Sequence, residues 1–171
     1  MNLAHKIRNQ MILKTASLLY LFDFDGTLTG SDDWHGYFKN CRLSLSQLHF
    51  NPSDLDIRWC ILTSRPKIDR WFIKMVCKHH KLYPKQIITG PTLTWKFKNV
   101  QQEAKYKEQI IKSILEGTFN ITYTDVDITK ICYIDNNDEI VKHLNDSRGD
   151  SRYLAMSVSD FITRDFVQLL S

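Results

Sequence analysis

The sequence predicts an α/β protein in which helices cover both faces of a central parallel sheet, a three-layer α/β/α, Rossmann-like arrangement. Apolar stretches of strand length alternate along the chain with stretches whose apolar residues recur at helical spacing. The first such stretch, residues 18–22, is apolar throughout, which is typical of a strand buried on both faces. Alternation of this kind implies parallel strands joined by right-handed crossovers. A length of 171 residues fits a single domain over 1–171.

The elements are expected in a regular order. Strands are predicted over residues 18–22, 58–63, 86–89, 130–134 and 153–158. Helices are predicted over 66–82 and 101–116, through 140–144, and from Ser159 onward. Pro66 suits the first turn of its helix, and Gly117 suits the residue that follows the end of the next one.

Two of the predicted helices carry a clear apolar stripe at helical spacing. In the first, the residues expected to be buried are Ile68, Trp71, Phe72, Met75 and Val76, with lysines 67, 74, 78 and 81 on the opposite face. In the second they are Ile110, Ile111, Ile114 and Leu115.

Composition places the chain in the globular class, with 43% hydrophobic and 25% charged residues. Four cysteines without a CxxC pair predict buried free thiols in a reducing compartment. No apolar run approaches the ~18 residues of a membrane-spanning helix, and the N-terminus does not resemble a secretory signal. We therefore expect a soluble, cytoplasmic protein without membrane association. Residues 1–16 fit either a short helix or a flexible lead-in.

Charge is distributed unevenly along the chain. The net charge is +4, but the segment from Lys67 to Lys112 holds eleven Lys or Arg against three acids, so it carries +8 and the remainder −4. This asymmetry predicts an anionic partner for the middle third of the chain.

The first predicted strand ends in the sequence Asp23-Phe24-Asp25-Gly26-Thr27. Two carboxylates at the end of a buried strand are costly unless a cation lies near them. Ligands of open α/β sheets bind at the carboxyl ends of the strands. The pair therefore predicts a metal site, and an acidic turn exposed to solvent is the alternative.

Residues 18–29, LLYLFDFDGTLT, resemble motif I of the haloacid dehalogenase (HAD) superfamily, hhhhDxDGT followed by Leu or Val and Thr. The resemblance implies a HAD fold and a Mg²⁺-dependent phosphatase. It implies that Asp23 attacks phosphorus to give an aspartyl-phosphate and that Asp25 acts as general acid and base. It also places Gly26 beside the phosphate.

The second predicted strand ends in Thr63, where the family has the Ser or Thr of its motif II. A hydroxyl and the amide of Ser64 at a helix start would bind a phosphate oxygen, although an ordinary helix cap explains the same residues. Arg65 is a further possible contact to substrate.

Motif III of the family is a lysine, for which the chain offers two candidates. Lys107 lies three, four and seven residues before apolar positions 110, 111 and 114, so it projects from the buried face of its helix. Lys105 shares the exposed face. A buried lysine must find an anion, so Lys107 is preferred and Lys105 remains the alternative.

Asp135 ends the fourth predicted strand, where motif IV of the family has a metal-binding acid. The chain departs from the family pattern next to it, because Asn136 follows. Asp138 is preferred as a second acid, ahead of Glu139. The implied metal ligands are Asp23, Asp25 through its backbone carbonyl, and Asp135.

The spacing of the motifs leaves no room for a folded cap domain, since residues 27–57 suffice only for a flap and a linking segment. Capless members of the family leave the site open, which favours large substrates. The basic, aromatic-rich middle third suits the end of a DNA or RNA strand, with Trp34, Lys96 and Lys98 as possible contacts. A nucleotide or small-metabolite phosphatase and a catalytically silent binding module are the alternatives. The sequence does not indicate an oligomeric state.

Overall fold

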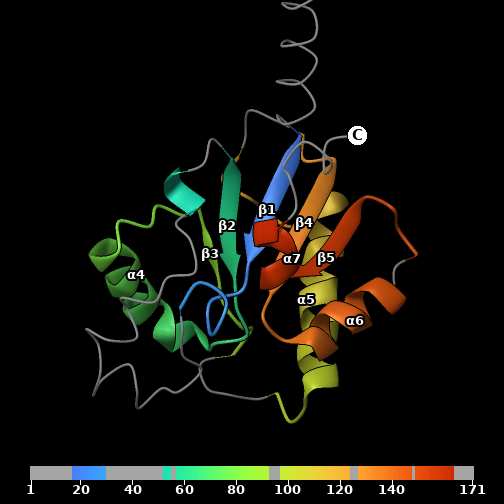
Figure 1. Cartoon of the computed structure of the whole chain (residues 1–171), viewed down its shortest axis with the longest axis horizontal. Coiled ribbons are helices and arrows are strands. Elements are labelled where there is room, and N and C mark those ends of the chain that lie inside the picture. The colour runs from blue at the N-terminus through green and yellow to red at the C-terminus, as the bar shows by residue number, and fades with distance from the viewer. Residues whose placement is uncertain are drawn as a thin grey trace, which may run out of the picture.

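A computed structural model of the chain describes residues 17–29, 52–54, 57–92, 97–123, 127–147 and 149–163. Its centre is a five-stranded, fully parallel sheet in the order β3-β2-β1-β4-β5 (Figure 1). The strands are β1 (Leu18–Phe22), β2 (Arg58–Leu62), β3 (Ile87–Ile88), β4 (Lys130–Asp135) and β5 (Tyr153–Ser157). The predicted parallel sheet is confirmed, and each strand differs from its expected bounds by no more than one residue at either end.

Helices cover both faces of this sheet. They are α4 (Arg70–His79), α5 (Val100–Leu115), α6 (Asp138–Asp146) and α7 (Val158–Thr163), with short 3₁₀ turns η1 (Pro52–Asp54) and η2 (Lys67–Asp69). Alternate residues of a strand point to opposite faces, so Tyr20 packs in the core shared with α4 and α7, while Leu21 packs with α5 and α6. In Figure 1, α7 lies in front of the sheet and α5 behind it. The predicted three-layer arrangement is thus confirmed.

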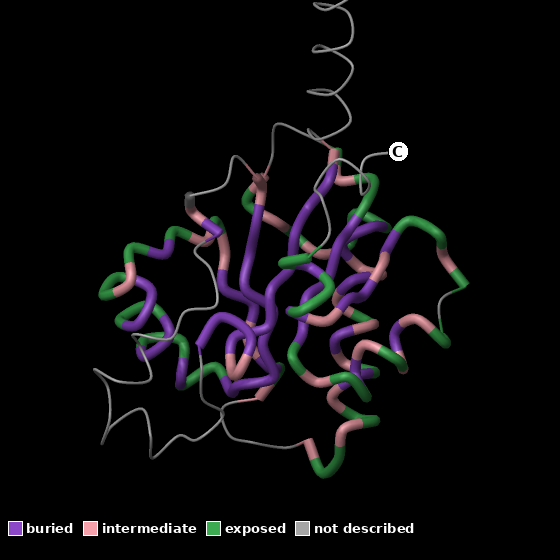
Figure 2. The backbone as a smooth tube through the Cα atoms, viewed as in Figure 1, coloured by how far each residue is buried: buried purple, intermediate pink, exposed green. Residues whose placement is uncertain are grey.

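β1 is the central strand, and all five of its residues are buried (Figure 2). Phe22, its last residue, pairs with Ile61 of β2 on one side and Ile134 of β4 on the other. Because the strands are parallel, the residues that follow these three positions come to the same edge of the sheet.

The predicted buried stripe of α4 is wrong for three residues. Ile68, Trp71 and Met75 are 59%, 56% and 46% exposed. The buried residues of the helix are Phe72, Ile73, Val76 and Cys77. Ile68 lies in η2, where each residue turns by about 120° and not 100°, so helical spacing counted from it does not hold. Trp71 and Met75 form a second apolar stripe beside the buried one, and the sheet meets only one of the two.

The α5 helix follows its sequence signals closely. Asn99 caps its start by accepting a hydrogen bond from the backbone N–H of Gln102 at 3.0 Å. Gly117 follows its end with φ of 71°, as expected of a glycine at this position. Within the described residues, no helix combines the length and apolar character needed to cross a membrane.

Candidate active site

Three residues expected to carry chemistry follow or end adjacent strands. Asp23 directly follows β1 and its backbone N–H donates to the Ile134 carbonyl at 2.9 Å, while Asp135 is the last residue of β4. Thr63 follows β2 and donates its backbone N–H to the Ile88 carbonyl at 2.9 Å. A cavity of ≈ 230 Å³ opens at this edge. Its lining residues include Asp23, Asp25, Ser64, Arg65, Glu103, Lys107, Asp135, Asn136 and Asn137.

Lys107 joins the acids of this cavity. Its Nζ donates to Asp23 Oδ1 at 3.0 Å and to Asp135 Oδ2 at 2.9 Å, and it lies 2.9 Å from Glu103 Oε1. The lysine side chain is 1% exposed, whereas Lys105 is exposed on the other side of α5. The position of Lys107 among the apolar residues of its helix therefore correctly indicated which lysine contacts the acids.

The electrostatics of Asp23 and Lys107 reflect their burial. Burial raises the pKa of Asp23 well above its usual value; the Lys107 ammonium opposes this rise, and Asp135 and Asp25 reinforce it. Burial alone would lower the pKa of Lys107, but the carboxylates around it, with that of Asp23 foremost, hold it well above its ordinary value. Lys107 is therefore a permanent cation, and Asp23 is a carboxyl group that retains a proton more readily than usual.

The Asp25 carboxylate contacts a different cation, Arg65. Arg65 Nε and Nη2 each donate to one oxygen of the Asp25 carboxylate at 2.7 Å, and Nη1 donates to Asp69 at 3.1 Å. Arg65 is 2% exposed, so it is a buried member of the site and not a solvated side chain. This bidentate geometry fixes the Asp25 carboxylate firmly.

The loop after β1 is tied to the loop after β4. Gly26 has φ of 71°, a conformation that favours glycine. The Thr27 hydroxyl donates to Asn136 Oδ1 at 3.1 Å, and the Asn136 backbone N–H donates to the same hydroxyl at 2.9 Å. The backbone N–H of Asn137 donates to Asp135 Oδ1 at 2.9 Å. These bonds hold Asp25 and Asp135 in a fixed relation.

Thr63 and Ser64, which follow β2, have different positions relative to the cavity. Thr63 is fully buried and its hydroxyl accepts a hydrogen bond from the Arg65 backbone N–H at 3.2 Å, so it supports the loop. Ser64 is the one of the two that lines the cavity. Both lie at the edge that the sequence predicted.

The remaining predicted contacts do not converge on the cavity. Asp138 is exposed at the start of α6 and is not among the lining residues, where Asn136 and Asn137 stand instead. Lys98 is exposed, and its backbone N–H donates to Gln102 Oε1 at 3.0 Å before α5. Trp34 and Lys96 lie outside the described residues, as does most of the expected flap over 27–57.

Sequence reasoning missed two acids and a tyrosine of the site. Glu103 lies four residues before Lys107 and Asp69 four residues after Arg65, and each acid contacts its cation at this four-residue spacing. That spacing was the available signal. Tyr133 donates its hydroxyl to Asp135 Oδ2 at 2.5 Å from within β4, and nothing in the sequence distinguishes it from an ordinary core residue.

The cavity contains carboxylates that could serve as ligands of a divalent cation. Its described lining residues carry four carboxylates, those of Asp23, Asp25, Glu103 and Asp135, against the two cations Arg65 and Lys107. Among the described residues, no three His, Cys, Asp or Glu side chains form a ready metal-binding group. Mg²⁺ is commonly held by one or two carboxylates together with waters and phosphate, and Asp23 and Asp135 supply such a pair. An excess of negative charge would also repel a phosphate dianion unless a metal offset it.

Comparisons with known proteins found no matching family model, no matching curated protein and no matching solved structure.

Proposed function

We propose that this chain is a Mg²⁺-dependent phosphomonoester hydrolase of the HAD type that acts through an aspartyl-phosphate. The observation that carries the proposal is the convergence of Asp23, Asp25, Asp135 and Lys107 on one cavity at the carboxyl edge of a parallel sheet. These residues come from three separate parts of the chain, since Asp23 and Asp25 share one segment. Asp23 and Asp25 lie within residues 18–29, which resemble motif I, and Lys107 and Asp135 follow in the order of the family's motifs III and IV.

In the proposed reaction, a carboxylate oxygen of Asp23 attacks phosphorus in line with the ester oxygen. The P–O bond breaks, its electron pair leaves with the alcohol oxygen, and protonated Asp25 donates a proton to that oxygen. Asp25, now ionised, then takes a proton from the water that hydrolyses the aspartyl-phosphate. Phosphate leaves and both acids return to their starting states.

The other residues of the cavity position these two acids. Lys107 orients Asp23 and balances part of its charge. Arg65 donates two hydrogen bonds to the Asp25 carboxyl group, and it must release one of the two oxygens before Asp25 can carry and donate a proton. Ser64 is the polar side chain of the segment after β2 that reaches the cavity.

Mg²⁺ would be held by Asp23 and Asp135 together with the backbone carbonyl of Asp25, and it would supply neutralisation of the charge on the phosphoryl oxygens.

The test is hydrolysis of an aryl phosphate by the purified chain with Mg²⁺ and with EDTA. We expect turnover with the metal, none with EDTA, and none in Asp23→Asn or Asp25→Asn, while circular dichroism shows both variants folded. Intact mass after an acid quench should reveal a phosphoryl adduct in the wild type that Asp23→Asn lacks. Turnover that persists in Asp23→Asn would exclude the covalent route.

A second candidate, a catalytically silent ion-binding module, is favoured by one observation. Both oxygens of Asp25 are engaged by Arg65, and an acid held in this way is not free to exchange protons. Arg65→Lys separates the two functions, because a lysine cannot hold both oxygens. In a phosphatase this change alters the pH dependence of kcat, whereas in a silent module the aryl phosphate is not hydrolysed by either protein.

A further inference from the structure

Helix α4 presents a row of cations to solvent. Arg70, Lys74 and Lys78 follow one another at a spacing of four residues, so they lie on one face and rise by about 6 Å at each step. All three are exposed. None of them forms an ion pair with another described residue. No described acid therefore offsets their charge.

These cations line a groove of ≈ 500 Å³ between α4 and the segment that leads into β3. Lys85 adds a fourth cation from the opposite wall, and Leu82 and Ile87 supply apolar surface. No Asp or Glu occurs among the described residues that line the groove. A concave surface with charge of one sign concentrates the field and attracts extended anions.

Aromatic rings accompany this charge. Tyr83 lines the groove and is 71% exposed, and Trp71, 56% exposed, lies on the neighbouring stripe of α4. Large exposed rings beside cations that pair with no described acid suit ligands that combine phosphates with planar groups.

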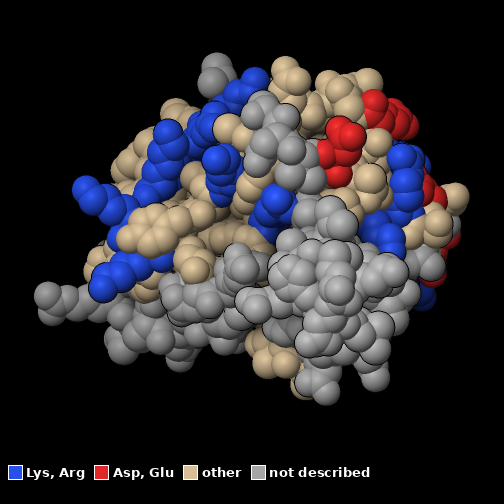
Figure 3. Space-filling view, turned by 90° about the horizontal axis from the view of Figure 1, so that it is seen from above, with Lys and Arg blue, Asp and Glu red and all other residues tan. Residues whose placement is uncertain are grey.

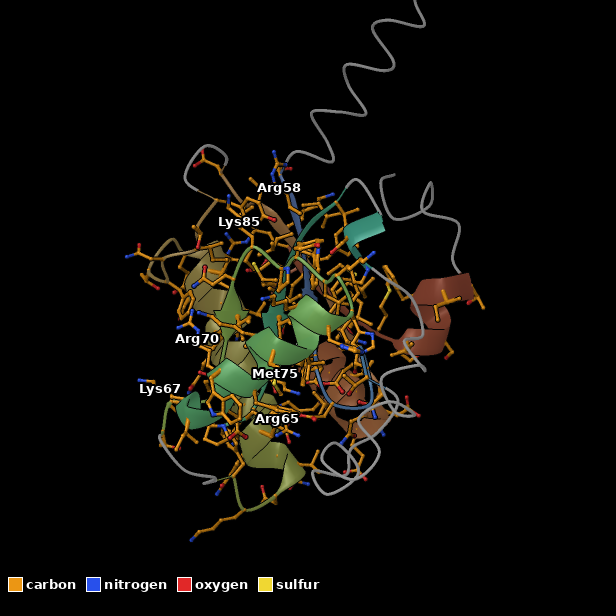
Figure 4. All side chains as sticks on the ribbon, turned by 90° about the vertical axis from the view of Figure 1, so that its left-hand side faces the viewer. Arg58, Arg65, Lys67, Arg70, Met75 and Lys85 are labelled. Atoms are coloured by element: carbon orange, nitrogen blue, oxygen red, sulfur yellow. The ribbon has the colours of Figure 1, made fainter. Side chains whose placement is uncertain are left out.

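The groove runs along α4, from Arg70 at the start of the helix to Tyr83 beyond its end. Lys and Arg gather on the left of Figure 3, the side on which α4 and β3 lie in Figure 1. In Figure 4, Lys85, Arg70 and Lys67 follow one another down this side toward Arg65, whose guanidinium contacts Asp25. Of the residues that line the groove, Arg70 is the one closest in sequence to Arg65, which lines the cavity.

We propose that this groove binds single-stranded nucleic acid and presents its phosphorylated end to the cavity at Asp23. The periodic cations contact successive phosphates, and the exposed rings stack on bases that a duplex would conceal. A phosphopeptide offers no such regular charge along its length, and a membrane surface would not enter a groove. The binding surface stands on its own evidence, and only the delivery of a terminal phosphate rests on the proposed function.

Fluorescence anisotropy with a labelled single-stranded oligonucleotide and the full chain tests binding. We expect Lys74→Glu/Lys78→Glu to weaken binding about 20-fold or more at 0.1 M salt. Each phosphate contact adds ~0.7 to the slope of log K against log salt, which amounts to ~0.7 logarithmic units of affinity at 0.1 M relative to 1 M salt. The matched control is Lys130→Glu/Lys142→Glu, which makes the same charge change at exposed lysines of β4 and α6 and should bind like the wild type. Tyr83→Ala should weaken binding several-fold, and Tyr83→Phe should not.

Equal loss of binding in the two double variants would overturn the proposal, as would tighter binding of a duplex, a phosphopeptide or anionic vesicles than of the single strand. Hydrolysis of an aryl phosphate is measured on the same proteins. Groove variants that keep this hydrolysis but lose release of phosphate from a 5′- or 3′-phosphorylated oligonucleotide support delivery. If Lys74→Glu/Lys78→Glu hydrolyses the oligonucleotide as fast as the wild type, delivery is contradicted and the proposed phosphatase is not. If the wild type does not hydrolyse the aryl phosphate, the phosphatase is contradicted and binding by the groove is not.

Discussion

Lys107 is outnumbered by the carboxylates that it contacts. Asp23, Asp135 and Glu103 each lie within 3.0 Å of its ammonium group, and the two aspartates are almost fully buried. Removing the common partner of a buried ion cluster leaves charges that neither water nor another cation compensates. The lysine is therefore needed for the fold as well as for the site.

We expect Lys107→Met to lower the free energy of unfolding by about 3–5 kcal/mol, the loss found when one partner of a buried ion pair is removed. Urea denaturation followed by circular dichroism measures it. Lys105→Met is the control, since it removes an exposed lysine two residues away on α5 and should change stability by less than about 0.5 kcal/mol. Equal stabilities of the two variants would show that the cluster is not held by Lys107.

The raised pKa of Asp23 makes a signed prediction about stability and pH. Burial is its main cause, and the folded chain retains a proton that the unfolded chain loses above the ordinary value of about 4. The stability of the wild type therefore falls as pH rises from that value toward the folded pKa. In Asp23→Asn this loss is absent, so we expect the variant to be more stable than the wild type at about pH 8 and equal to it at about pH 3.

Urea denaturation at both pH values provides the comparison, with Asp127→Asn as a control at an exposed aspartate. A variant less stable than the wild type at the higher pH would mean that the bond from Lys107 outweighs burial at Asp23.

For individual side chains, the sequence predicted which ones meet at this cavity wherever a strand end or a helical phase placed them. Asp23 and Asp135 follow from strand ends, and Lys107 from its place among apolar residues of a helix. The bidentate pairing of Arg65 with Asp25 was not predictable, because forty residues separate the two and only the parallel sheet brings them together. Asp138 was preferred by spacing alone, and the turn after β4 exposes it.

Among the elements, the loop after β3 supports the segment that carries Arg65. The backbone N–H of Gly90 donates to the Arg65 carbonyl at 2.7 Å. A Cβ at Gly90 would lie 2.7 Å from the Ser64 carbonyl oxygen and 3.1 Å from that of Arg65. Both neighbours are backbone atoms, so the whole segment would have to move.

We expect Gly90→Ala to lower kcat for an aryl phosphate by about tenfold or more, since small displacements of a positioning group cost that much or more. It should also destabilise the fold by about 1–3 kcal/mol through overpacking. Gly149→Ala is the control, because a Cβ there would meet no atom within 4 Å. Wild-type kcat and stability in Gly90→Ala would show that the loop tolerates the shift and does not position Arg65.

It was easier to predict which stretches form strands than to predict which face of a helix is buried. Strands of the sheet were recognisable because burial on both faces makes them continuously apolar. Helix α4 offers two overlapping apolar stripes, one with Phe72 and Val76 and one with Trp71 and Met75. The spacing of apolar residues fits either stripe as the buried one. Which stripe is buried depends on where the edge of the sheet lies.

For the molecule as a whole, the two signs of charge are separated in space. The cavity at the carboxyl edge has more acids than cations among its described lining residues, while the groove beside α4 has cations only. The asymmetry along the sequence therefore corresponds to two surfaces with different ligands. A polyanion attracted by the groove would meet repulsion at the cavity unless a cation is bound there.

This requirement makes a final prediction about metal binding. A ligand that binds only the folded state stabilises it by about 2.7 kcal/mol at a concentration of 100 times its Kd. For a chain of this length we expect Mg²⁺ at that saturation to raise Tm by roughly 5–10 °C. NaCl at equal ionic strength should not raise Tm, and EDTA should reverse the rise caused by Mg²⁺.

Asp135→Asn should abolish the rise in Tm, because the change removes one of the two carboxylates that meet at Lys107. Glu139→Gln, at an exposed acid of α6, should leave the rise intact. A rise of equal size in NaCl, or one that survives in Asp135→Asn, would mean that the excess of carboxylates at this edge is balanced by protons and Lys107 and not by a metal.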